Sequence, residues 1–252
     1  MNFAPALLQA LRQSAHVVVF SGAGMSAESG VPTFRDAQTG LWAQYDPTEL
    51  ATPEAFRQHP KRVWDWYAWR RELVAQARPH AGHRAVAALE RHVPQVTVVT
   101  QNVDGLHQEA GSRRVVELHG NLRRIVCARC RAVVPQTAWA PAGPEGVPRC
   151  PHCGGLLRPD VVWFGEPLPA DAWRAAQQAM QTADVVLVVG TSGVVYPAAG
   201  LPLLARERGA RLVEVNPTET ALTPVVDDVL RGPAGEVLPA LVRAAWGGEG
   251  NG

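Results

Sequence analysis

Four short apolar runs constrain the fold of this chain more than any other feature. They are His16–Phe20, Val96–Thr100, Val185–Val189 and Arg211–Val215, and each ends at a glycine or a polar cluster. The runs are mostly continuous rather than alternating, which is typical of strands buried on both faces of a parallel sheet. Helix-like stretches lie around and between them, at 4–15, 81–92, 170–182, 198–208 and 235–246. Strands that alternate with helices predict an α/β fold with a Rossmann-like, doubly wound parallel sheet.

Two segments do not fit this alternation. Residues 31–78 are rich in proline, tryptophan and arginine, which predicts a loop followed by short helices. Residues 121–158 contain all four cysteines and few periodic apolar positions. We therefore expect both segments to be insertions that together form a smaller lobe.

The composition excludes several classes of protein. Hydrophobic residues make up 46% of the chain and charged residues 19%, which is typical of a globular protein. The formal net charge is +1, with Lys61 as the single lysine, so no overall basic field favours nucleic acid or membranes. No apolar run is long enough for a bilayer, and the first residues lack the pattern of a signal peptide. We expect a cytoplasmic monomer.

A glycine-rich turn follows the first apolar run. Gly22-Ala23-Gly24-Met-Ser-Ala27 fits the pattern G-x-G-x-x-G/A, in which backbone amides approach a pyrophosphate. The pattern also fits an ordinary tight turn between a strand and a helix. Gly30 and Pro32 prevent a long crossover helix, so a cofactor loop replaces the usual second βα unit. Phe34 and Arg35 on that loop can cover a ligand and contact its phosphates.

Polar residues follow the second run, where the carboxyl ends of parallel strands form binding sites. Gln101, Asn102 and Asp104 suit a carboxamide and ribose hydroxyls, with an Asn/Asp turn that opens a helix as the alternative interpretation. His119 precedes a glycine at the junction with the smaller lobe, where an imidazole can act as a base near pH 7.

The cysteines form two C-x2-C knuckles, Cys127–Cys130 and Cys150–Cys153. This spacing predicts a four-thiolate zinc site with no position left open for water, and therefore a structural metal. Redox sensing is the alternative interpretation.

Further segments border the expected cleft. Gly190-Thr191-Ser192 and Asn216 follow the third and fourth runs and can contact a ribose or phosphate. The extended pieces 161–166 and 193–195 can each offer an edge for β-strand addition by a peptide, or they can pack in the core.

In this order, the motifs resemble the sirtuin family from about residue 16 to residue 234. The resemblance implies NAD as co-substrate, one structural Zn²⁺, and removal of acetyl and succinyl or malonyl groups from protein lysines bound as extended peptides. The products would be nicotinamide, free lysine and O-acyl-ADP-ribose, with His119 as general base. It implies that the cofactor is bound by Gly22, Ala23, Gly24, Glu28, Phe34, Arg35, Trp42, Gln101, Asn102, Asp104, Gly190, Thr191, Ser192, Asn216 and Ala234.

The resemblance also divides the chain. It implies an NAD-binding lobe over 1–34, 79–120 and 159–252, a cofactor loop with a helical insertion over 35–78, and a zinc module over 121–158. The acylated peptide would contact Tyr67, Arg70, Val162, Phe164, Gly165, Glu166 and Val194.

Tyr67 and Arg70 indicate which acyl group is preferred. Three residues apart on a helix, they share a face, and together a phenol and a guanidinium can bind a terminal carboxylate. This resembles the sirtuins that accept succinyl-, malonyl- and glutaryl-lysine. In the alternative interpretation, Tyr67 packs in the core and Arg70 is solvated.

Two other functions remain open at this level. A protein mono-ADP-ribosyltransferase would use the same nicotinamide pocket. A nucleic-acid-binding zinc ribbon would use the arginines between Arg113 and Arg131, but these lack interleaved aromatic residues.

Overall fold

The computed structural model describes residues 1–32 and 45–247. Its centre is a six-stranded parallel sheet with the order β3-β2-β1-β6-β7-β8. The strands are β1 (His16–Ser21), β2 (Gln95–Thr100), β3 (Val115–Glu117), β6 (Val185–Val189), β7 (Arg211–Val215) and β8 (Asp228–Leu230). The chain builds outward from β1 and then returns to place β6 on its other side. The carboxyl ends of β1 and β6 therefore form the switch point at which such sheets bind ligands.

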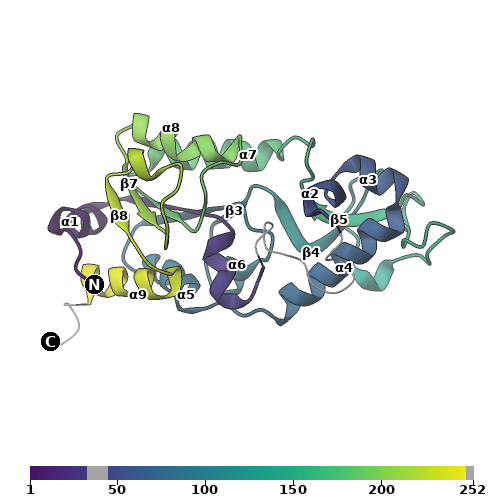
Figure 1. The fold of residues 1–252 in the computed structure, drawn as a ribbon, viewed down its shortest axis with the longest axis horizontal. Coiled ribbons are helices and arrows are strands. Elements are labelled where there is room, and N and C mark those ends of the chain that lie inside the picture. Colours follow the sequence, from purple (N-terminus) through teal and green to yellow (C-terminus); the bar gives the residue numbers. More distant parts are fainter. Residues whose placement is uncertain (33–44, 248–252) are drawn as a thin grey trace.

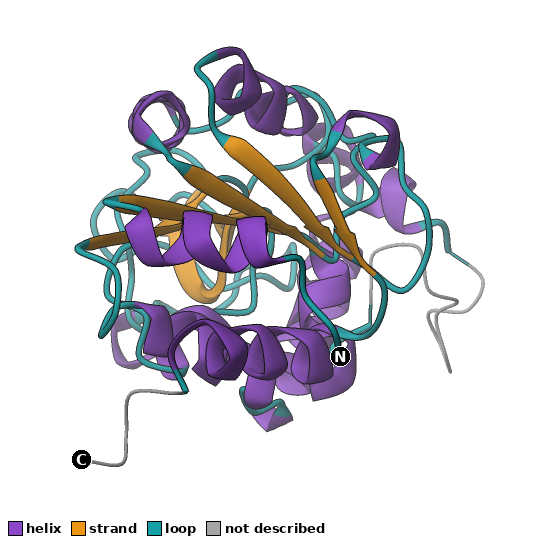
Figure 2. Cartoon of the chain, turned by 90° about the vertical axis from the view of Figure 1, so that its left-hand side faces the viewer, coloured by secondary structure: helices purple, strands orange, loops and turns teal. Residues whose placement is uncertain are grey.

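Helices cover both faces of this sheet (Figures 1 and 2). Alternate strand residues point to opposite faces, so Val17 and Val19 pack in one apolar cluster while Val18 and Phe20 pack in another. The first cluster includes α1 (Pro5–Gln13), α5 (Ala81–Leu89) and α9 (Ala234–Trp246). The second includes α7 (Ala170–Thr182), the 3-10 turn Ala198–Gly200 and α8 (Leu201–Glu207). The doubly wound sheet expected from the apolar runs is confirmed.

The remaining elements form a separate region at the other end of the molecule (Figure 1). It contains α2 (Pro47–Leu50), α3 (Pro53–Gln58) and α4 (Pro60–Gln76), with the antiparallel pair β4 (Gly120–Cys127) and β5 (Leu157–Val161). We call these elements and the cysteine-bearing loops between β4 and β5 the small lobe. The six-stranded sheet with α1 and α5–α9 is the sheet lobe, where α6 is the short helix Leu106–Glu109.

The expectation of only short helices in residues 31–78 is wrong for α4, which has 17 residues. Prolines stand in the first turns of α3 and α4, where the missing N–H costs no hydrogen bond. Pro60 therefore starts a helix rather than interrupting one. On the first turn of α4, Lys61 pairs with Asp65, and its aliphatic stem lies against Gly146.

Several remaining bounds agree with the sequence analysis. The predicted ranges of β6, β7 and α7 match the observed ones, while α5 ends at Leu89 rather than residue 92. The edge strand β8 and the pair β4–β5 were not predicted. The turn Ala23–Ser29 is a 3-10 helix that stops at Gly30, whose positive φ of 76° ends it, as Gly30 and Pro32 predicted.

Candidate functional site

A cavity of about 1560 Å³ lies between the carboxyl ends of the sheet strands and the small lobe. This volume exceeds that of a typical small-ligand pocket, so it has room for a dinucleotide together with part of a peptide. Most of the predicted site residues line it: Gly22, Ala23, Gly24, Tyr67, Arg70, Gln101, Asn102, Asp104, His119, Val162, Phe164, Gly165, Glu166, Gly190, Thr191 and Ser192.

The other predicted residues lie elsewhere. Phe34, Arg35 and Trp42 are outside the described residues. The Glu28 carboxylate accepts a hydrogen bond from the Gly235 backbone N–H at the start of α9, at 2.7 Å. Ala234 packs in the core of the sheet lobe, and Val194 is 47% exposed beside the cavity residue Val195. Asn216 lies behind the cavity wall, where its Nδ2 donates to the Thr191 carbonyl oxygen at 3.2 Å.

The glycine turn after β1 packs directly on the turn after β6. The Gly22 N–H donates to the Val189 carbonyl oxygen, and the Gly24 N–H donates to that of Gly190 at 2.8 Å. A Cβ added at Gly190 would lie 2.2 Å from the Met25 nitrogen, and the φ there is 58°. Only glycine permits this contact, which leaves bare backbone facing the cavity, as an approaching pyrophosphate requires.

Asn102 and Asp104 are joined by Ser26, which sequence reasoning did not single out. The Ser26 hydroxyl donates to Asp104 Oδ2 at 2.7 Å, while Asn102 Nδ2 donates to the Ser26 oxygen at 3.2 Å. The Leu106 N–H donates to Asp104 Oδ1 at 2.8 Å. Burial raises the pKa of the Asp104 carboxyl, although these hydrogen bonds oppose the rise. All three side chains are buried at the cavity wall, which fixes their orientation before any ligand binds.

His119 has a defined tautomer. Its Nδ1 lies 3.1 Å from the Gln101 carbonyl oxygen, which can only accept a hydrogen bond. Nδ1 therefore carries the proton, and Nε2 keeps its lone pair. Burial lowers the pKa of His119, so the imidazole is neutral and able to accept a proton at pH 7. A Cβ at the next residue, Gly120, would lie 2.0 Å from the Asp160 oxygen, so glycine lets β4 begin immediately after the histidine.

Three further histidines pack edge to face behind Ser26. The rings of His80 and His83 are 4.4 Å apart, and those of His83 and His107 are 5.0 Å apart. Burial lowers the pKa of His83 to about 2 and that of His107 to about 4. His107 lies in α6, and its Nε2 is 2.9 Å from the Ser21 oxygen. These rings support the site from inside the sheet lobe.

Tyr67 and Arg70 reach the same cavity from one face of α4. The Arg70 guanidinium lies over the buried Trp66 ring, 5.1 Å from its centroid. Tyr67 is 3% exposed, so its ring is packed while it lines the cavity. The small lobe thus places a phenol and a guanidinium on one wall, the pair required to bind a carboxylate.

The segment that follows β5 forms another wall. The Val162 N–H donates to the His119 carbonyl oxygen, and the Phe164 N–H donates to that of Ala51. Glu166 forms a two-point ion pair with Arg158, at 2.6 and 2.8 Å. Phe164 after β5 and Val195 and Tyr196 after β6 also line the cavity and are at least 41% exposed, so both lobes contribute exposed apolar side chains to it.

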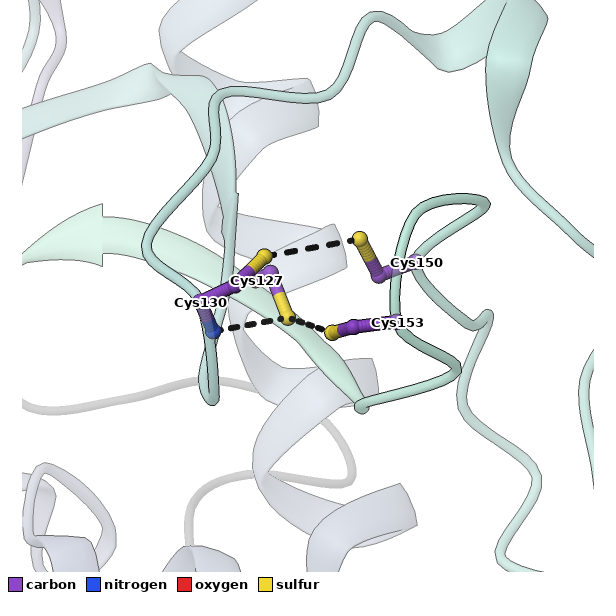
Figure 3. Close-up of side chains that lie close together, drawn as sticks. All are labelled: Cys127, Cys130, Cys150 and Cys153. Carbon is purple, nitrogen blue, oxygen red and sulfur yellow. Dashed lines mark hydrogen bonds between the residues drawn. The ribbon is translucent and has the colours of Figure 1, made fainter.

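The four cysteine side chains of the small lobe lie close together (Figure 3). Their sulfur atoms all lie within 4.8 Å of one another, with Cys127 and Cys153 at 3.4 Å and Cys130 and Cys150 at 3.8 Å. Tetrahedral zinc with bonds of about 2.3 Å places its sulfur ligands about 3.8 Å apart. The cluster therefore fits Zn²⁺. Neighbouring His152 is exposed and is not part of it.

The arginines proposed for nucleic-acid binding largely have carboxylate partners. Arg113 pairs with Glu90, Arg123 with Glu109, and Arg124 with both Glu117 and Asp160. These pairs neutralise the local positive charge on which a phosphate-binding surface depends. Within residues 1–32 and 45–247, no helix is both long and apolar enough to cross a bilayer.

Comparisons with known proteins agree with this geometry. The model of the Sir2 family matches residues 22–197. An NAD-dependent protein deacylase 2 of Pyrobaculum aerophilum is 58% identical over 233 residues, which cover 92% of each chain. A crystal structure of a Sir2 homologue in complex with NAD is 48% identical, with a TM-score of 0.89 over 98% of this chain and 95% of the other.

A second solved structure resembles the chain at lower identity. It holds a Sir2 protein with a deacetylated p53 peptide and 3'-O-acetyl-ADP-ribose. The two chains are 34% identical, and the TM-score is 0.81 over 96% of this chain and 98% of the other.

Proposed function

This chain belongs to the Sir2 family, the sirtuins, and from that premise we propose that it removes acidic acyl groups as well as acetyl groups from protein lysines. It is an NAD-dependent protein deacylase that carries one structural Zn²⁺. The similar proteins whose names and bound ligands include NAD, a peptide and acetyl-ADP-ribose support this assignment.

The arrangement of Asn102, Asp104 and His119 around one cavity is the observation that carries the proposal. In the proposed reaction, hydrogen bonds through Ser26 fix Asn102 and Asp104 in place, and these side chains hold the nicotinamide end of NAD. The acyl oxygen of the substrate displaces nicotinamide from the ribose, and His119 Nε2 takes the proton of a ribose hydroxyl, which then attacks the acyl carbon. Water completes the release of lysine and O-acyl-ADP-ribose.

The zinc site stays outside these steps. Four thiolates leave no coordination position for substrate or water, so the metal supplies folding energy rather than chemistry.

The preference for acidic acyl groups rests on Tyr67 and Arg70. Both line the cavity from α4, and Arg70 is placed by its contact with the Trp66 ring. A carboxylate at the end of a succinyl or malonyl chain would receive a charge-assisted hydrogen bond from the guanidinium. An acetyl group ends in a methyl group, which cannot accept a hydrogen bond.

The peptide would bind as an extended strand against the exposed apolar side chains of the cavity, Phe164 after β5 and Val195 and Tyr196 after β6. Val162 and Phe164 already use their N–H groups inside the protein, so any bonds to a peptide come from other backbone groups of 162–166 and 193–195.

The role of His119 is tested by the variant His119→Ala. Loss of a general base lowers turnover by roughly 100- to 10,000-fold, and we expect at least the smaller effect on kcat with acetyl- and succinyl-lysine peptides. NAD binding, measured by calorimetry, should persist because the glycine turn is intact. Normal turnover by this variant would contradict the assignment.

The acyl preference is tested by Arg70→Met, with acetyl-, succinyl- and malonyl-lysine peptides compared in parallel. A charge-assisted hydrogen bond contributes about 1.5–3 kcal/mol, so kcat/KM for succinyl-lysine should fall about 10- to 150-fold. Deacetylation should fall much less. Equal losses with both peptides would contradict an acidic acyl pocket.

Product analysis separates deacylation from mono-ADP-ribosyl transfer. With NAD labelled in its adenosine, we expect the label in O-acyl-ADP-ribose. Label that stays attached to protein would instead indicate ADP-ribosyl transfer.

A further inference from the structure

Trp163 occupies a position that the reaction described above does not use. It follows β5, lines the cavity and is 2% exposed. Its ring is a neighbour of Phe56, Arg158 and Tyr67. The Arg158 guanidinium is 3.3 Å from the ring centroid, and the Tyr67 ring is nearly parallel to it, at 28° and 6.3 Å.

Other contacts fix the indole in this position. The Trp163 backbone N–H donates to Glu166 Oε2 at 2.9 Å, and Arg158 grips both oxygens of the same carboxylate. Arg158 also donates to the Val161 carbonyl oxygen at 2.8 Å. Arg158 is buried and Glu166 is partly buried, and their ion pair joins the end of β5 to the turn that carries the ring.

The indole N–H of Trp163 has no acceptor in hydrogen-bond geometry among the described residues, although Nε1 is fully buried. An unsatisfied buried donor costs about 1–3 kcal/mol, so such a group calls for an explanation. Burial raises the pKa of the Tyr67 phenol, and the neighbouring Arg70 and Trp163 oppose that rise. The Trp163 and Tyr67 rings are neighbours, with centroids 6.3 Å apart, and both residues line the cavity, so the orphan N–H and the phenol belong to one wall.

We propose that Trp163 is a specificity-determining residue of the acyl pocket. Its N–H donates to the Tyr67 oxygen when an acidic acyl chain is bound, and this directs the phenol proton onto the acyl carboxylate. The inference rests on the acidic acyl pocket proposed above.

The donor and acceptor inventory supports this role. A tyrosine hydroxyl has one proton to donate, while tryptophan and arginine side chains can only donate. Beside Trp163 and Arg70, the Tyr67 oxygen can accept from either, but neither offers an acceptor for its proton. A terminal carboxylate supplies that acceptor, and an acetyl group ends before it can.

The variant Trp163→Phe removes the N–H and keeps an aromatic ring beside Arg158 and Tyr67. We measure kcat/KM for succinyl- and acetyl-lysine peptides and take their ratio. One neutral hydrogen bond corresponds to roughly a 3- to 10-fold fall in this ratio. Trp139→Phe is the matched control, because Trp139 packs in the same lobe and its N–H donates to the Val134 carbonyl oxygen, away from the cavity. Its ratio should not change.

A double-mutant cycle with Tyr67→Phe excludes a purely structural effect. If Trp163 acts through the Tyr67 hydroxyl, Trp163→Phe should no longer lower the ratio once that hydroxyl is absent. A fall of the same size in both backgrounds would overturn the role of Trp163. The cycle also remains informative if Trp163→Phe is less stable. Each ratio compares two peptides with the same variant, so the amount of folded enzyme cancels.

The two proposals fail in different ways. If Tyr67→Phe and Arg70→Met lower the ratio but Trp163→Phe does not, the acidic pocket stands and the role of Trp163 is wrong. If none of the three variants lowers the ratio, the acidic pocket itself is wrong.

Discussion

The sheet lobe and the small lobe are stabilised by different kinds of interaction. Every residue of β1 and β6 is buried, and apolar clusters cover both faces of the sheet. The small lobe has one two-stranded sheet, an apolar cluster rich in tryptophan, and four thiolates. Hydrophobic burial is spread over many side chains, whereas a metal site depends on a few bonds.

The division also separates two parts of the chemistry. Asn102, Asp104 and His119 come from the ends of sheet strands, while Tyr67, Arg70 and Trp163 come from the small lobe. In our proposal, use of NAD depends on the first lobe and choice of acyl group on the second. A change to the interactions that stabilise one lobe should therefore affect that lobe first.

Removal of zinc should have the largest effect, and only on the small lobe. A structural zinc site contributes about 10–16 kcal/mol of folding free energy, as much as the stability of a whole domain. Treatment of the holoenzyme with a strong chelator at pH 7.5 should shift tryptophan fluorescence to the red, because Trp64, Trp66 and Trp163 are in the small-lobe core. Far-UV circular dichroism should keep the signal of the sheet lobe. Loss of both signals together would show that the lobes do not respond separately.

Acid should act on the sheet lobe through His83 and His107. Their folded pKa values, about 2 and about 4, are below the unfolded value, so the unfolded state binds more protons below about pH 6.5. The two neutral imidazoles contribute their full stabilisation of the folded state above that pH, and this contribution is lost as the pH falls. Between pH 7 and pH 5 the loss is about 2 kcal/mol for each ring.

This loss can be measured by urea unfolding at the two pH values, followed by circular dichroism. His83→Leu should reduce the difference in the free energy of unfolding between the two pH values by about 2 kcal/mol. A free energy of unfolding that is equal at pH 7 and pH 5 would rule out buried neutral imidazoles.

Loss of a helix cap should give the smallest effect. The Thr52 hydroxyl accepts a hydrogen bond from the Ala55 N–H at 3.0 Å at the start of α3. Thr52→Ala should lower the free energy of unfolding by about 1 kcal/mol. Urea unfolding followed by tryptophan fluorescence should report it, because α3 and α4 belong to the small lobe. A change of several kcal/mol would mean that Thr52 contributes more than one cap hydrogen bond.

Much of the sheet lobe was predictable because its residues follow periodic rules. Continuous valine runs such as Val185–Val189 indicate strands buried on both faces, and polar residues after them indicate a site at the carboxyl edge. The cysteine spacing was as informative as the valine runs, because tetrahedral zinc ligands recur at typical C-x2-C spacings. Strand β8 carried no such signal, because it is a three-residue edge strand that is not fully buried.

The remaining parts of the site depend on contacts between distant parts of the chain. Ser26 becomes important because the end of β1 meets Asn102 and Asp104 after the end of β2. The Glu28 carboxylate accepts a hydrogen bond from the Gly235 N–H, more than 200 positions away in the sequence. The place of Glu28 after the glycine-rich turn therefore did not reveal this contact. No local pattern could show that the Trp163 indole would lie beside Tyr67.

The helix that presents Tyr67 and Arg70 also carries Lys61, the one lysine in this sequence. Reactive acyl thioesters that modify proteins indiscriminately thus find a single side-chain amine on this enzyme. Acylation there would cancel the positive charge that Asp65 pairs with, on the first turns of α4. In mixtures of enzyme, acyl donor and substrate, lysine-bound label on the enzyme reports on one site.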